Sequence, residues 1–186
     1  MKRAILTIVF FVSSSLACSG IAWAQSTIDA FGAKIIFTKP NEEAWTLVKE
    51  INPSENSKGV RTFKYVKITG DKGATVEPVI SLIVEKVMGT SDAMAYSLNG
   101  LKRMQESSNL TWDVLGGYPA YSSDRHSIVY KGSYTRSGAI HKVYLCYILS
   151  NGIGVVVIAD STKDDFSQVD DDMLAFIKSV VIQAQP

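Results

Sequence analysis

The sequence predicts an α+β fold built on one mainly antiparallel sheet. Short runs of β-branched and aromatic residues alternate with compact turn clusters, which is the pattern of strands joined by tight turns. Two other segments repeat their apolar residues at helical spacing. No internal repeat, long linker or low-complexity stretch interrupts the chain between Gln25 and Pro186, so one domain is expected over residues 25–186.

Residues 1–24 are predicted to be a signal peptide. Met1-Lys2-Arg3 is a short basic start, and Ala4–Val12 is almost wholly apolar. Ala22-Trp23-Ala24 then supplies the small residues that signal peptidase accepts, which places the cut after Ala24. No later apolar run approaches membrane-spanning length. The mature protein is therefore expected to be soluble and either periplasmic or secreted.

Two alternatives to a cleaved secretory peptide stay open. Cys18 follows Ser15-Leu16-Ala17 in a degenerate lipoprotein signal, which would leave the protein anchored by lipid. The stretch Ala4–Ala24 is also nearly long enough to be a retained membrane helix.

Cleavage after Ala24 would leave a nearly neutral chain with one cysteine. Lys2 and Arg3 would leave and no acid would, so 17 of the 19 basic residues would stand against 18 acidic ones, a net charge near −1. Such a net charge gives no electrostatic attraction to nucleic acid or to an anionic membrane. Because only Cys146 would remain, no internal disulfide is expected and the fold must depend on its core.

Three strands are predicted in the first half of the domain. They are the β-branched and aromatic runs Ala33–Phe37, Val60–Ile68 and Pro78–Val87, the last two joined by a turn at Gly70-Asp71-Lys72-Gly73. The segment Glu42–Ile51 suits either a helix or a strand, because its apolar residues fit both periods.

Two helices are predicted. The first begins at an N-cap Ser91 and runs to about Met104, with Met94, Leu98 and Leu101 on one face. The second lies near the C-terminus, with Asp165 as its cap, Asp170–Asp172 in its first turn and Lys178 near its end, an order that suits the helix dipole. Its apolar stripe comprises Val169, Met173, Phe176, Ile177 and Val180.

A three-strand meander is predicted between the two helices. Ser127–Thr135 and Ile140–Leu149 form a hairpin around Ser137-Gly138, and Asn151-Gly152 turns the chain into Ile153–Asp160. The last strand is apolar on both faces and is expected at the centre of the sheet. Counting outward from a two-residue loop pairs Tyr134 with His141, Tyr130 with Leu145 and Ile128 with Tyr147.

Taken together, several of these segments resemble the PsbP-like proteins. The group includes the extrinsic PsbP protein of photosystem II, exported bacterial proteins such as DcrB, and a Ran-binding nuclear protein. The resemblance rests on Lys39-Pro40-Asn41-Glu42-Glu43-Ala44-Trp45, on Gly116-Gly117-Tyr118-Pro119-Ala120-Tyr121 and on Phe176-Ile177-Lys178-Ser179-Val180.

The resemblance implies an α/β/α sandwich, in which helices cover both faces of a mainly antiparallel sheet. It also implies a non-enzymatic accessory or binding role, and it favours a strand over a helix at Trp45–Ile51. Nothing in the chain matches residues that give a photosystem role, so that role is not carried over.

No catalytic site or cofactor is predicted. A nucleophilic hydrolase needs Ser or Cys beside a His that a carboxylate orients. The chain has no Gly-x-Ser-x-Gly elbow, and Cys146 falls in mid-strand, where a small core thiol is expected. Gly152-x-Gly154 opens a strand and is interpreted as a turn rather than a phosphate loop.

No metal site is predicted either. In the expected register His126 lies level with Leu149, about 26 Å along the ladder from His141. The only two histidines therefore cannot share one ion. The aspartates near the C-terminus, which are Asp160, Asp164, Asp165, Asp170, Asp171 and Asp172, lack the spacing of a calcium loop.

Tyr118 and Tyr121 are the predicted binding-surface residues. They flank Pro119 in an expected loop, where binding residues are often found. The other large aromatic residues could line a groove for an apolar ligand, a sugar or a peptide, although cross-strand core pairs are their commoner role. These residues are Trp45, Trp112, Tyr130, Tyr134, Tyr144 and Tyr147.

Three functions are compatible with the sequence. The first is an exported non-enzymatic accessory protein that binds a protein or another envelope component. The second is a small-ligand carrier with an aromatic pocket between sheet and helix. The third is an undetected hydrolase or metalloprotein, which would need His126 or His141 in a cleft beside a carboxylate with a perturbed pKa.

Overall fold

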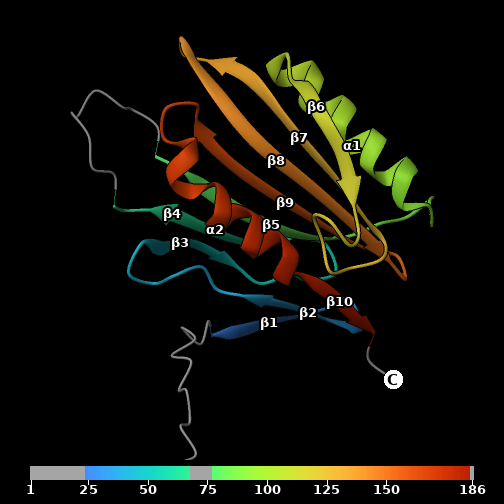
Figure 1. Cartoon of the computed structure of the whole chain (residues 1–186). Coiled ribbons are helices and arrows are strands. Elements are labelled where there is room, and N and C mark those ends of the chain that lie inside the picture. The colour runs from blue at the N-terminus through green and yellow to red at the C-terminus, as the bar shows by residue number, and fades with distance from the viewer. Residues whose placement is uncertain (1–23, 68–76, 185–186) are drawn as a thin grey trace, which may run out of the picture.

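The computed structural model describes residues 24–67 and 77–184, which form two antiparallel sheets and two helices (Figure 1). The α+β class is confirmed. The expectation of one sheet is wrong, because the first two strands and the last one form a sheet of their own. Cys18, the rest of the predicted signal peptide up to Trp23 and the predicted turn at Gly70–Gly73 lie outside the described residues.

The larger sheet has seven strands in the described part of the chain. Their spatial order is β3 (Trp45–Ile51), β4 (Gly59–Tyr65), β5 (Val79–Lys86), β9 (Ile153–Thr162), β8 (Ala139–Ser150), β7 (Ser127–Arg136) and β6 (Thr111–Gly117). The smaller sheet has the order β1 (Gln25–Ala30), β2 (Ala33–Thr38) and β10 (Val181–Ala184). As predicted, β9 lies at the centre of the larger sheet.

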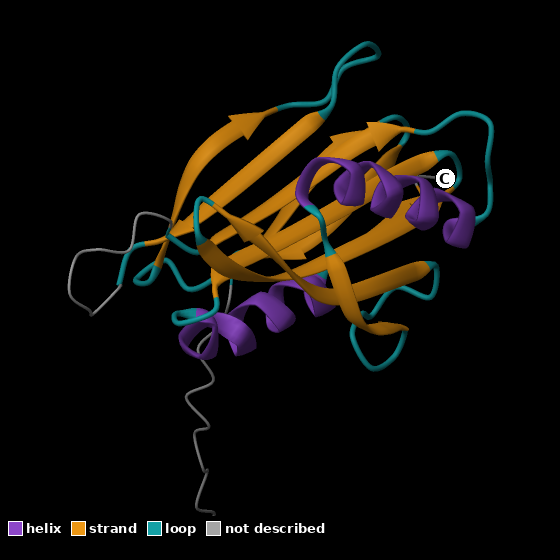
Figure 2. Ribbon diagram, turned by 90° about the horizontal axis from the view of Figure 1, so that it is seen from above, coloured by secondary structure: helices purple, strands orange, loops and turns teal. Residues whose placement is uncertain are grey.

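The two helices lie on opposite sides of the larger sheet (Figure 2). Helix α1 (Ala93–Ser108) contacts β7 and β8, and α2 (Phe166–Ser179) contacts β8 and β9 from the other side. Helix α2 also contacts β2, so that the smaller sheet extends the layer that α2 forms. This is the α/β/α arrangement that the sequence resemblance implied. Neither helix is long and apolar enough to cross a membrane.

The core on the α2 side joins three parts of the fold. The predicted stripe of α2 is confirmed, since Val169, Met173, Phe176 and Ile177 are fully buried. The ring of Phe176 lies 5.8 Å from that of Phe37 in β2 and 5.6 Å from that of Phe63 in β4. The smaller sheet, the larger sheet and α2 therefore share one aromatic cluster.

The face of α1 that meets the sheet differs from the predicted one. Of the three predicted residues only Leu101 is buried, whereas Met94 and Leu98 are 39% and 51% exposed. The buried face instead carries Tyr96, Ser97 and Gly100, whose missing side chain leaves room for the ring of Tyr147. Hydroxyl and glycine contacts thus fix the helix orientation, and apolar periodicity does not detect them.

The N-cap of α1 is Asp92 rather than Ser91. Its carboxylate accepts hydrogen bonds from the backbone N–H groups of Met94 and Ala95. A carboxylate two or three residues ahead of these donors satisfies two of the unpaired N–H groups at the helix start.

The predicted meander has the predicted register. Ser137 and Gly138 both have positive φ, 51° and 83°, as a two-residue hairpin loop requires. Tyr134 pairs with His141, Tyr130 with Leu145 and Ile128 with Tyr147. Turn chemistry was enough to fix these pairs because the loop residues themselves determine the register.

The ambiguous segment is the strand β3, so the helical interpretation is wrong and the one favoured by the family resemblance is confirmed. Only Trp45 is buried in it, and its indole N–H donates to Asp172 of α2 at 2.9 Å. The other six residues of β3, which is an edge strand of the sheet, are exposed. Strands β1, β6 and β10 were not predicted from the sequence.

Candidate functional site

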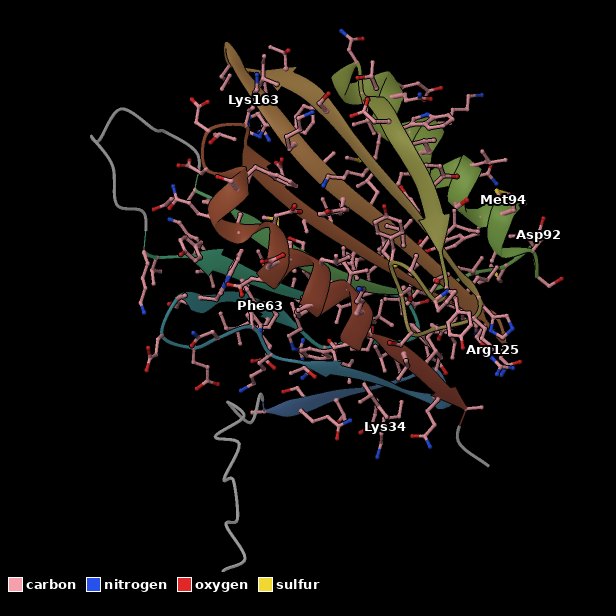
Figure 3. The ribbon with its side chains drawn as sticks, viewed as in Figure 1. Lys34, Phe63, Asp92, Met94, Arg125 and Lys163 are labelled. Atoms are coloured by element: carbon pink, nitrogen blue, oxygen red, sulfur yellow. The ribbon has the colours of Figure 1, made fainter. Side chains whose placement is uncertain are left out.

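The Tyr118 loop, defined as residues 118–126 between β6 and β7, presents an aromatic and two basic side chains to solvent. Tyr118 is 50% exposed, and the guanidinium carbon of Arg125 lies 5.8 Å from the centre of its ring. A cation over an aromatic face at this distance is attractive. His126 is exposed beside Arg125. Arg125 lies on the same side of the molecule as Asp92 and Met94 at the start of α1 (Figure 3).

The one carboxylate of this loop, Asp124, is turned inward and holds the loop to the rest of the fold. It is 7% exposed. Its Oδ1 accepts from the backbone N–H of His126 at 2.8 Å, and its Oδ2 accepts from that of Ile182 in β10 at 3.1 Å. The Ser127 hydroxyl donates to the carbonyl of Asp124 at 2.7 Å. The loop is thus tied to the smaller sheet.

The two predicted tyrosines have different surroundings. Tyr121 is partly buried against the α2-side core, and its N–H donates to the carbonyl of Gly117 at 2.8 Å. A side chain at Gly116 would collide with its ring. Tyr121 therefore supports the loop, while Tyr118 is presented to solvent. A binding role for either tyrosine stays a prediction.

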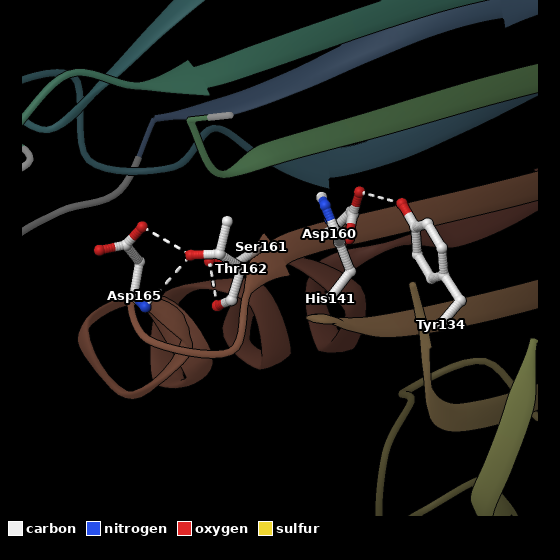
Figure 4. Close-up of polar contacts among 6 residues, drawn as sticks. All are labelled: Tyr134, His141, Asp160, Ser161, Thr162 and Asp165. Carbon is white, nitrogen blue, oxygen red and sulfur yellow. Dashed lines mark hydrogen bonds and ion pairs between the residues drawn. The ribbon is translucent and has the colours of Figure 1, made fainter. Parts of the chain in front are cut away.

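Tyr134, His141 and Asp160 form a second polar cluster (Figure 4). It lies on the α1 side of the larger sheet, where Tyr134 packs against the core that contains Tyr96 and Leu101 of α1. The Tyr134 hydroxyl donates to Asp160 at 2.6 Å, and Nδ1 of His141 is hydrogen bonded to the other oxygen of Asp160 at 3.1 Å. The rings of Tyr134 and His141 are stacked with centres 4.8 Å apart. Burial raises the pKa of Tyr134, and the hydrogen bond to Asp160 adds to this effect.

This cluster contains the His–carboxylate pair of a catalytic triad but lacks the access that catalysis needs. His141 is 0% exposed, and within the described residues its Nε2 has no hydrogen-bond partner. His141 does not line the pockets at the β1–β2 turn or the pocket beside β3. The sequence predicted the Tyr134–His141 pair but missed Asp160. The Asn151-Gly152 turn carried the signal, since counting across β8 and β9 places Asp160 opposite Val143, beside His141.

The two histidines do not come together. The N–H of Leu149 donates to the carbonyl of His126 at 3.4 Å, which confirms that His126 lies level with Leu149 at the far end of the hairpin from His141. Over residues 24–67 and 77–184, no group of three or more His, Cys, Asp or Glu side chains is arranged to hold a metal ion.

The acidic residues near the C-terminus act differently from the prediction. Helix α2 begins at Phe166, so Asp170–Asp172 lie beyond its first turn. Asp170 accepts a hydrogen bond from the Tyr144 hydroxyl at 2.7 Å, and Asp172 accepts one from the indole N–H of Trp45. Asp165 is the N-cap residue, but its side chain makes no capping bond and accepts from Thr162 instead. Asp170 and Asp172 thus connect α2 to aromatic donors of the larger sheet.

Cys146 lies in β8 and is fully buried, as predicted. Burial raises the pKa of its thiol, and the charge of Asp124 acts in the same direction. A buried, protonated thiol is a poor nucleophile.

The described residues form several surface pockets. One of about 540 Å³ lies between the β1–β2 turn, residues 53–55 and Lys86. A second of about 210 Å³ adjoins it and shares Phe31, Glu55 and Lys86. The third, of about 330 Å³, lies beside β3 and is lined by Trp45 and Phe63. None of the three is lined by the tyrosines that a carrier pocket between sheet and helix would use.

No family model matches the chain, and no curated protein matches it. Similar solved structures include LpqN, which is involved in cell envelope biogenesis of Mycobacterium tuberculosis; it is 16% identical, with a TM-score of 0.57 over 87% of this chain and 92% of LpqN. Another is PA94 from Pseudomonas aeruginosa, a protein of unknown function, at 10% identity and a TM-score of 0.52 over 79% of this chain and 89% of PA94.

Cyanobacterial PsbP (CyanoP) from Synechocystis sp. PCC 6803 is also among the similar structures. It is 11% identical, with a TM-score of 0.45 over 91% of this chain and 98% of CyanoP. At such identities the likeness to LpqN and PA94 concerns the fold alone.

Proposed function

We propose that this protein is an exported, non-enzymatic accessory protein that binds a component of the cell envelope through the Tyr118 loop. The observation that carries the proposal is the arrangement of that loop. Its carboxylate is buried and bound by two backbone N–H groups, while Tyr118, Arg125 and His126 face solvent.

The chemistry of the loop suits a binding surface. Tyrosine and arginine are enriched where protein interfaces gain most of their affinity. A loop that is already held in place loses little conformational entropy on binding, which favours affinity. The hydrogen bond from Ile182 to Asp124 supplies this order from a distant part of the chain. A partner with an acidic or aromatic group would complement the exposed side chains of the loop.

Two further observations support the location and the class of protein. Residues 1–24 have the pattern of a signal peptide. The fold is shared with LpqN, a protein involved in cell envelope biogenesis, which supports an envelope role by analogy of fold. The burial of His141 and Cys146, the two side chains best suited to catalysis, supports a non-enzymatic role.

Affinity capture from intact cells after chemical crosslinking tests the proposal. Wild-type protein is expected to retain a specific envelope component, and Tyr118→Ala and Arg125→Ala are expected to lose it. Ile140→Ala is the matched control, because Ile140 is 49% exposed but lies at the tip of the β7–β8 hairpin. Tyr121 is left unchanged because it supports the loop. Equal capture by all four proteins would overturn the proposal.

A further inference from the structure

Strand β3 forms one edge of the larger sheet. Strand β3 ends the larger sheet on the side opposite β6, and it pairs only with β4 among the described residues. Six of its seven residues are exposed. A free edge presents backbone N–H and C=O groups that can pair with an extended chain. The edge is occupied at both ends. The N–H of Trp45 donates to the carbonyl of Asn41 at 2.8 Å, and the guanidinium of Arg61 donates to the carbonyl of Ile51 at 2.8 Å, so the available groups lie between these two.

Apolar side chains are exposed along this edge. Leu47 is 39% exposed and Val48 is 55% exposed, and Val66 on the adjoining loop is 54% exposed. Edge strands are usually guarded against chance pairing by charges or bulges. Here β3 has a bulge at Val48 followed by the charged Lys49, whereas Trp45–Leu47 carries no charge.

A pocket of about 330 Å³ opens beside this uncharged first half. Pro40, Trp45, Leu47 and Phe63 contribute its apolar lining. Its floor is fixed, because Trp45 is hydrogen bonded to Asp172 at 2.9 Å and its ring lies 5.1 Å from that of Tyr65. Strand addition at a sheet edge gains affinity from backbone hydrogen bonds and specificity from such side-chain pockets.

The charges around the edge favour a nearly neutral segment with one acidic residue. Lys39 pairs with Glu42 at 3.4 Å, and Lys67 pairs with Glu43 at 3.5 Å. Glu50 pairs with Arg61 at 2.9 Å. Lys49 is exposed and forms no ion pair with any residue that the structure describes. A carboxylate opposite Lys49 would complete this pattern.

We propose that β3 is a second binding surface, which accepts an extended peptide segment of a partner protein as an additional strand. An apolar side chain of the segment enters the pocket beside Trp45, and an Asp or Glu lies opposite Lys49. This surface is separate from the Tyr118 loop, which follows β6 at the other end of the sheet.

The test is selection of a phage-displayed library of short random peptides against the intact protein, followed by synthesis of the enriched sequence. We expect alternating apolar residues with one acid. N-methylation of the peptide amides that face β3 should abolish binding, and methylation of the alternate amides should not. Leu47→Lys and Lys49→Glu are each expected to weaken binding by at least about tenfold. Leu98→Lys is the matched control, since Leu98 is 51% exposed on α1.

Three results would overturn the proposal. One is the absence of any enriched sequence. Another is an enriched peptide that Leu98→Lys weakens and Leu47→Lys does not. The third is a dimer in sedimentation that Leu47→Lys dissociates and that excludes the peptide, which would assign the edge to a second copy of the chain. If the β3 proposal fails, the proposed role of the Tyr118 loop is unaffected, because the capture experiment that tests the loop uses different variants.

Discussion

The two faces of the larger sheet bury different chemistry. On the α2 side Ile80, Leu82, Val84, Val155 and Val157 are all 0% exposed and face α2 and the smaller sheet. On the α1 side the buried set is smaller and richer in tyrosine, with Tyr96, Tyr130 and Tyr147. One face of the sheet thus carries a continuous apolar layer, and the opposite face carries a layer whose tyrosine hydroxyls need hydrogen-bond partners.

This difference between the two faces predicts that one face determines most of the folding stability and the other determines how that stability changes with pH. Apolar burial is the main source of folding free energy and does not depend on pH. A buried hydroxyl must be hydrogen bonded, and it becomes costly when it ionises. Tyr96 donates to Glu85 at 2.7 Å, and Tyr130 shares a hydrogen bond with Ser97 at 2.9 Å. We therefore expect the α2 side to dominate stability and the α1 side to dominate its dependence on alkaline pH.

The largest expected effect is on the α2 side. Phe176→Ala removes the ring that joins Phe37 and Phe63, so it should lower the free energy of unfolding by about 3–5 kcal/mol. Urea denaturation followed by tryptophan fluorescence measures the loss. Leu98→Ala on the exposed side of α1 is the control, and should change stability by no more than about 0.5 kcal/mol. Similar losses for both variants would contradict the comparison.

A smaller effect is expected where α1 meets the sheet. Gly100→Ala places a methyl group against the ring of Tyr147, which must shift. Overpacking of this kind should cost about 1–3 kcal/mol. The same denaturation experiment measures it, and Tyr147→Leu in the Gly100→Ala background should recover part of the loss. An unchanged Gly100→Ala protein would show that α1 is not held as closely as the structure has it.

Alkaline pH should destabilise the protein through its buried tyrosines. Burial raises the pKa of Tyr147 to about 12, and burial together with the hydrogen bond to Glu85 raises that of Tyr96 as well. In the unfolded chain tyrosines ionise near about pH 10. The unfolded state therefore loses protons first, so stability is complete below that pH and falls as the pH rises above it.

Urea midpoints measured across this alkaline range test the direction. Tyr96→Phe should be less stable than wild type at neutral pH, because Glu85 loses a donor, but its stability should fall less steeply above pH 10. Parallel slopes for the two proteins would remove Tyr96 as a source of the effect.

The smallest effect is expected at acid pH. Burial acts to raise the pKa of Glu85, but the hydrogen bonds from Lys58 and Tyr96 and the charge of Lys58 lower it by more. Glu85 therefore contributes stability above its unfolded pKa, near about 4.3, and this contribution is lost as the pH falls through its lower folded value. Glu85→Gln should flatten the acid side of the stability profile. An unchanged profile would contradict this assignment.

Local sequence signals predicted the parts of the fold that short segments determine. The loop Ser137-Gly138 fixed the register of β7 and β8, and the stripe from Val169 to Ile177 located the buried face of α2. Strand β10 has only four residues and β6 ends in two glycines, so neither carries enough pattern to be recognised. Their strand conformation depends on pairing with β2 and β7.

The candidate site was predicted only in part for the same reason. Tyr118 could be predicted because a tyrosine beside a proline in a loop is recognised from neighbouring residues alone. The role of Asp124 could not be predicted, since one of its hydrogen-bond donors is Ile182, 58 residues further along the chain. The functions of Asp170 and Asp172 were misjudged because Tyr144 and Trp45 reach them from separate strands. Contacts between distant segments are what the sequence pattern does not show.

The most direct test of the proposed function is site-specific photocrosslinking in intact cells. A benzoylphenylalanine in place of Tyr118 would report what this loop touches, and the same residue in place of Ile140 serves as the control at the hairpin tip. We expect one discrete adduct with an envelope component from position 118 and none from position 140. No adduct at position 118, or the same adduct from both positions, would contradict a binding role for the Tyr118 loop.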